Sequence, residues 1–114
     1  MSNHSGTGLP FKTLCEEDDL RIIYCYKCQA FHVSYGAIYL DLYKPAMEGL
    51  IHTLTEKKEE YRGYPEVLSQ SIKVKTSCKG ISLLMNLYDV EYLLSKLRKA
   101  FLKFEADYWG VNLN

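Results

Sequence analysis

Apolar and polar residues alternate with a period of two in several short stretches, which is the pattern of a strand with one buried face. Residues 20–24 are rich in β-branched and aromatic side chains, and residues 31–35 alternate regularly. Alternation resumes over residues 38–42, but with the opposite phase. Gly36 lies at the change of phase, which predicts a bulge or a turn at this position.

The second half of the chain has a further pair of alternating stretches, at residues 71–76 and 81–87, on either side of a Cys-Lys-Gly turn. This arrangement predicts a hairpin. Two longer segments repeat apolar residues every three or four positions and predict helices, the first from Pro45 to Glu60 and the second between Asp89 and Gly110. Their apolar stripes are Met47, Leu50, Ile51 and Leu54 in the first, and Val90, Leu93, Leu94, Leu97, Phe101 and Phe104 in the second.

These elements predict an α+β fold with the order β-β-β-α-β-β-α. We expect one antiparallel sheet of four or five strands with two helices on one face, because most strands alternate as a half-solvated sheet does. Residues 1–14 are rich in Gly, Ser, Thr and Asn and predict a mobile N-terminal arm. A chain of 114 residues fits one hydrophobic core, so residues 15–114 are expected to form a single domain.

The charge balance excludes several classes of partner. The chain has 14 basic and 14 acidic residues, so a bulk attraction to nucleic acid or to an anionic membrane is absent. No apolar run approaches the roughly 20 residues that span a bilayer. The N-terminus lacks a basic segment followed by an apolar stretch, the pattern of a secretory signal, and the sequence therefore predicts a cytoplasmic protein.

Four cysteines are the most chemically informative residues, and two of them form a Cys25-x-x-Cys28 pair. Two thiolates at this spacing can converge on one tetrahedral zinc ion. The spacing Cys15-x9-Cys25-x2-Cys28-x3-His32 supplies the two remaining ligands, although no glycine follows Cys28 to relax such a turn. His32 should point away from the side chains of its neighbours Phe31 and Val33. Three residues are substitutes for His32 as the fourth ligand: His4, His52 and Cys78.

Two other interpretations of the pair stay open at this stage. Cys25 and Cys28 could form the redox dithiol of a thiol oxidoreductase, but such pairs lie at a helix N-terminus, and strand-like sequence flanks this pair on both sides. The cysteines could also be small apolar residues of the core, since free cysteine is among the most buried residue types. No catalytic motif, nucleotide-binding loop or cofactor fingerprint is present, so the sequence favours a non-enzymatic role.

Aromatic residues crowd the first half of the chain beside basic ones. An exposed sheet of this composition is how some proteins stack single-stranded nucleic acid. The acidic block at residues 16–19 argues against that function. Tyrosine is also enriched at protein interfaces, so we expect a protein partner, with a homodimer as the first choice. The aromatic residues concerned are Tyr24, Tyr26, Phe31, Tyr35, Tyr39 and Tyr43.

Residues 23–36 contain a C-x-x-C pair, then an aromatic strand that ends in a Tyr-Gly pair. This pattern resembles a group of short bacterial proteins that form a domain family of unknown function. The later hairpin and acidic-capped helix, residues 71–106, are similar too. The resemblance implies a cytosolic bacterial protein and carries no activity. The sequence as a whole predicts a small non-enzymatic protein-interaction module, with structural zinc at Cys25 and Cys28.

Overall fold

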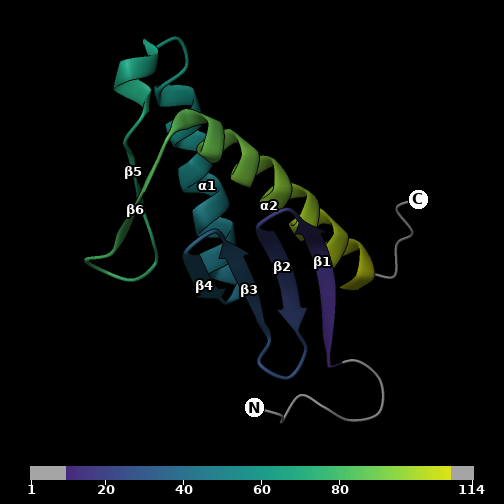
Figure 1. The fold of residues 1–114 in the computed structure, drawn as a ribbon. Helices are drawn as coiled ribbons and strands as arrows, with labels where there is room; N and C mark the ends of the chain where they lie inside the picture. Colours follow the sequence, from purple (N-terminus) through teal and green to yellow (C-terminus); the bar gives the residue numbers. More distant parts are fainter. Residues whose placement is uncertain (1–9, 109–114) are drawn as a thin grey trace. The chain divides into compact units, whose positions relative to one another are not determined.

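The computed structural model describes residues 10–108 and confirms the α+β class (Figure 1). All elements predicted from the pattern are present, and one further strand precedes them. The elements in chain order are β1 (Phe11–Glu17), β2 (Leu20–Cys25), β3 (Ala30–Tyr35), β4 (Ile38–Leu42), α1 (Lys44–Glu60), the 3₁₀ helix η1 (Glu66–Ser69), β5 (Ile72–Lys75), β6 (Ser82–Met85) and α2 (Leu87–Tyr108).

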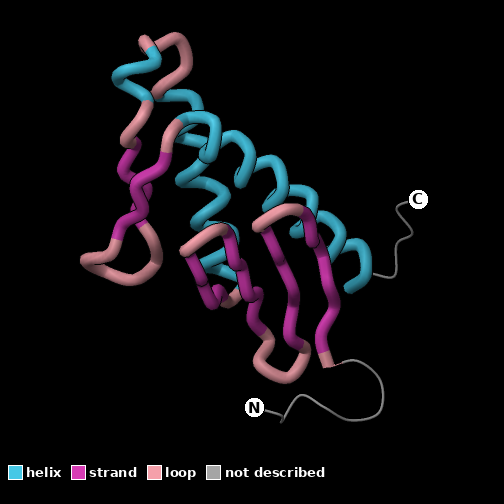
Figure 2. Tube along the Cα trace, viewed as in Figure 1, coloured by secondary structure: helices cyan, strands magenta, loops and turns pink. Residues whose placement is uncertain are grey.

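The strands form two antiparallel sheets rather than one. The first has four strands in the order β1-β2-β3-β4, and β5 and β6 pair with each other as a separate two-stranded sheet (Figure 2). The sequence pattern does not predict β1, because a bulge between Thr13 and Cys15 breaks its alternation. Residues 11–14 belong to this strand, so the expected arm over residues 1–14 is corrected there, and its first nine positions lie outside the described residues.

The chain divides into two compact units. The first combines the residues up to Pro45 with those from Lys99 onward, and the second contains Ala46–Arg98. Each unit holds fully buried apolar side chains, such as Phe31 in the first and Leu97 in the second. The candidate site described below lies in the first unit. The single domain expected over residues 15–114 stays a prediction.

One face of the four-stranded sheet is covered by the end of α2. Phe31 is completely buried, and its ring centroid lies 4.9 Å from that of Phe104 and 5.9 Å from that of Phe101. Tyr24 lies beside the same helix, with 4.5 Å between its ring centroid and that of Phe104. Lys12 forms an ion pair with α2 through Asp107. Aromatic contacts of this kind add to the free energy gained by burying apolar area, so they fix this face towards the helix.

The opposite face of the sheet is open. Along β3, Phe31 and Val33 are buried, whereas the intervening His32 belongs to the open face, as its alternation predicts. A two-residue turn with Gly36 at a φ of +59° joins β3 to β4 and aligns His32 opposite Asp41. Glycine adopts this left-handed backbone without the steric cost that a side chain brings.

In the second unit, most residues of the two predicted helical stripes are buried, and Ile51 is half-buried. Met47, Leu50 and Leu54 are buried on α1, and Val90, Leu93, Leu94 and Leu97 are buried on α2. The α2 helix begins two residues before Asp89, and the Asn86 side chain caps it by accepting a hydrogen bond of 2.7 Å from the Asp89 N–H. No helix of residues 10–108 is long and apolar enough to cross a membrane.

Candidate metal centre

A tight turn between β2 and β3 carries the two cysteines of the C-x-x-C pair. Cys25 ends β2 and pairs with Ala30, the first residue of β3. The Gln29 N–H donates a 2.8 Å hydrogen bond to the Cys25 carbonyl, and the Cys28 N–H donates one of 3.1 Å to the Cys25 sulfur. Gln29 has a φ of +57°, so it takes the left-handed backbone that a glycine would adopt more easily. The turn therefore closes with Gln29, although no glycine follows Cys28.

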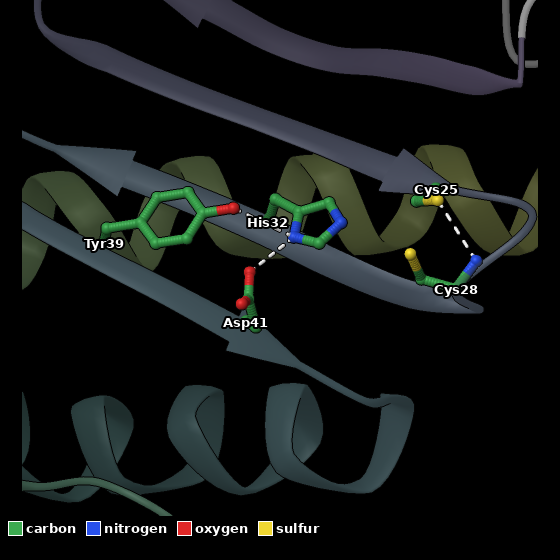
Figure 3. Close-up of polar contacts among 5 residues, drawn as sticks. All are labelled: Cys25, Cys28, His32, Tyr39 and Asp41. Carbon is green, nitrogen blue, oxygen red and sulfur yellow. Dashed lines mark hydrogen bonds and ion pairs between the residues drawn. The ribbon is translucent and has the colours of Figure 1, made fainter. Parts of the chain in front are cut away.

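The turn brings three potential metal ligands together. One ligand atom from each of Cys25, Cys28 and His32 lies within 4.8 Å of the other two (Figure 3). A tetrahedral zinc ion with Zn–S bonds of about 2.3 Å separates two sulfurs by about 3.8 Å, so small side-chain rotations suffice to reach that geometry. Cys25 is buried at 1% exposure, His32 is half-buried and Cys28 is exposed. The ion would therefore lie at the surface, on the open face.

Cys15 is not brought to this group, although its spacing in the sequence makes it a candidate ligand. It pairs with Ile22, whereas Ile23 pairs with His32. Successive residues of a strand point to opposite faces, and directly paired residues share one face. Cys15 therefore belongs to the face of the sheet opposite His32, so the predicted set of four ligands is reduced to three.

The three substitutes for His32 are not part of the group either. His52 is exposed on α1, with its Nε2 3.3 Å from Glu56 Oε2. Cys78 is exposed in the turn between β5 and β6, and both residues belong to the second unit. His4 lies outside the described residues. All four cysteines of the chain are free of disulfide bonds.

Asp41 and Tyr39 hold the imidazole of His32 from the neighbouring strand. His32 Nδ1 lies 2.5 Å from Asp41 Oδ1 and 3.2 Å from the Tyr39 hydroxyl (Figure 3). The rings of Tyr39 and His32 are stacked with an interplanar angle of 6°. Because Nδ1 is hydrogen-bonded to Asp41, the other ring nitrogen, Nε2, is available to bind a metal. A carboxylate behind a histidine is the usual way to fix the tautomer and orientation of a metal ligand.

The local hydrogen bonds shift the pKa values of the two thiols in opposite directions. Burial acts to raise the pKa of Cys25, but hydrogen bonds to its sulfur from the backbone and side chain of Cys28, from His32 and from the Lys27 backbone outweigh it, so this pKa is lowered. The pKa of Cys28 is raised, chiefly because its side chain hydrogen-bonds to Cys25. Partial burial and the charges of Cys25 and Asp41 act in the same direction, and Lys27 opposes them. Cys25 is thus the first of the two to ionise.

Tyr39 and Asp41 are the residues of the site that the sequence interpretation did not assign. The alternation predicts Asp41 on the open side but gives it no partner. The signal was nevertheless present, because a two-residue turn at residues 36–37 pairs position 32 with position 41. Reading the turn rather than the strand alone would have placed the carboxylate beside the histidine.

The site gathers two thiols, one imidazole and one supporting carboxylate within the first unit. This donor set is one that zinc prefers in proteins, since it combines soft sulfur with nitrogen. Its function has to be inferred from this chemistry, because no protein-family model, no curated protein and no solved structure matches the chain.

Proposed function

We propose that this protein is a small metal-binding module that holds a zinc ion through Cys25, Cys28 and His32. The observation that carries the proposal is the convergence of the three ligand atoms within 4.8 Å. The orientation of His32 by Asp41 supports it, because the carboxylate leaves one defined nitrogen for the ion. Binding would link the β2–β3 turn to the middle of β3, so it would stabilise the folded sheet by mass action.

A thiol oxidoreductase receives less support from the same site. Such an enzyme needs an exposed thiolate, commonly at a helix N-terminus. Here Cys25, the thiol with the lowered pKa, is 1% exposed, while the exposed Cys28 has a raised pKa. The residues after the pair form β3 rather than a helix. The arrangement suits two ligands of one ion better than a nucleophile and its resolving partner.

The distribution of aromatic residues bears on the two other expected roles. Tyr24 and Phe31 contact α2 on the covered face, whereas Tyr39 is 62% exposed on the open face. The aromatic residues therefore do not form one platform on which single-stranded nucleic acid could stack. A protein partner or a homodimer stays a prediction, for which the exposed residues Tyr26, Tyr39 and Tyr43 offer aromatic contacts in the first unit.

Replacing one ligand should abolish stoichiometric zinc binding. We expect one zinc per chain in the purified protein, and less than about a tenth of that in Cys28→Ser, because two remaining ligands hold the ion weakly. Elemental analysis together with a count of free thiols measures both quantities. Cys15→Ser is the matched control and should retain the metal. Full thiol reactivity and no metal in the unsubstituted protein would refute the proposal.

Asp41→Asn should weaken metal binding while leaving all three ligands in place. The affinity is expected to fall about 10- to 100-fold, as for other carboxylates that orient a histidine ligand. Competition with a chelator measures the dissociation constant, and the melting temperature of the metal-free protein serves as a check on folding. Asp18→Asn, which removes an exposed carboxylate from the turn between β1 and β2, should change the affinity little. Equal effects of the two substitutions would contradict the positioning role of Asp41.

The pH dependence of alkylation separates the metal site from a redox dithiol. In metal-free protein, the rate at Cys28 should reach half of its maximum above about pH 8.5, the pKa of a free cysteine, because the raised pKa keeps this thiol protonated. Iodoacetamide labelling at a series of pH values, followed by peptide mass spectrometry, gives the rate for each cysteine. A half-maximal rate well below pH 8.5 at Cys28 would favour the oxidoreductase instead.

A further inference from the structure

A hollow of about 330 Å³ lies on the open face of the sheet beside the proposed metal centre. His32 belongs to both, and Phe11, which also lines the hollow, pairs with Cys25. The volume lies within the range of small-molecule sites. The lining residues are Phe11, Arg21, Ile23, His32, Ser34 and Tyr39. The hollow thus combines two apolar side chains, two hydroxyls, one guanidinium and one metal-binding imidazole.

The described residues leave one coordination position of a zinc ion at this site for a further donor. Tetrahedral zinc takes four ligands, and three are available here. Among residues 10–108, no fourth histidine, cysteine or carboxylate joins the group of Cys25, Cys28 and His32. Because Cys28 is exposed, a molecule in solvent can reach an ion held at this point.

Arg21 gives the hollow its anion-binding group. It lies opposite Ser34, two residues along the strands from the pair Ile23 and His32 and on the same face of the sheet. Two such pairs are about 7 Å apart, so the long arginine side chain can meet a ligand that extends from the metal. Glu16 pairs with Arg21 across β1 and β2, but no ion pair joins their side chains in the described part of the chain. The guanidinium can therefore accept a carboxylate as partner.

The affinity of zinc for sulfur favours a thiolate as the fourth donor, and the charges around the ion tolerate it. Two thiolates and a neutral imidazole bring zinc to zero net charge, and zinc readily accepts a third sulfur. The additional negative charge would be offset by Lys27, between the two cysteines, and by Arg21. Asp41 and Glu16 act in the opposite direction. The sum of these charges is close to zero. A ligand with both a thiolate and a carboxylate is therefore tolerated only if the thiolate reaches the zinc ion and the carboxylate reaches Arg21.

We infer that the hollow binds a small thiol that carries a carboxylate. Its sulfur would take the fourth position on the metal after releasing its proton to solvent, and its carboxylate would pair with Arg21. The carbon chain between them would lie along Phe11 and Ile23. This inference rests on the proposed metal site, because without the ion the hollow has no group that binds the sulfur of the ligand.

The test uses the full chain loaded with cobalt(II), whose visible absorption reports on its ligands. We expect 3-mercaptopropionate to shift the cobalt bands at a concentration about tenfold lower than 2-mercaptoethanol, which lacks the carboxylate. Propionate, which lacks the thiol, should leave the bands unchanged. Equal potency of the two thiols, an unshifted spectrum or loss of the bands through removal of the metal would each overturn the inference.

Two variants assign the effect to the hollow. Arg21→Gln should remove the tenfold advantage of 3-mercaptopropionate while binding cobalt normally. Lys103→Gln, which changes an exposed lysine on α2 in the same unit, should preserve the advantage. An advantage that survives in Arg21→Gln would refute the role of the hollow. Failure of the unsubstituted chain to bind cobalt would instead refute the proposed metal site, so the two failures are distinguishable.

Discussion

The antiparallel register of β2, β3 and β4 is the constraint on which the rest of the site depends. It aligns Ile23, His32 and Asp41 in one row, and Cys25 with Ala30 in the next row on the same face. Two tight turns fix this register, one at residues 26–29 and one at residues 36–37. A slip of one residue in β3 would move His32 into the position of a buried side chain and separate it from Asp41, because neighbours in a strand point to opposite faces.

One face of the sheet stabilises the fold, and the other carries the residues of the candidate site. Contacts with Phe101 and Phe104 hold Phe31 against α2, and this burial keeps the register from slipping. The open face needs no apolar cover and can therefore expose cysteine, histidine and arginine to solvent. The proposed metal site and the adjacent hollow share His32, so a ligand bound in the hollow would lie next to the proposed ion.

Much of the fold follows from periodicity alone, because β2–β4, the second hairpin and both helices have strong alternating or helical patterns. The bulge in β1 interrupts the alternation by which that strand could be recognised. The number of sheets depends on which strands pair, and no local sequence pattern contains that information. At the site, the spacing of Cys25, Cys28 and His32 predicts the three side chains that the fold brings together. The same spacing wrongly includes Cys15, because a count of residues does not tell which face of a sheet a side chain occupies.

The central claim is that one metal ion is bound by two sulfurs and one imidazole nitrogen of this chain. X-ray absorption spectroscopy of the zinc-loaded protein measures the number and distance of these ligands directly. The account predicts sulfur neighbours at about 2.3 Å, at least two in number, and one imidazole nitrogen at about 2.0 Å. A first shell of oxygen alone, or one without the imidazole, would contradict it.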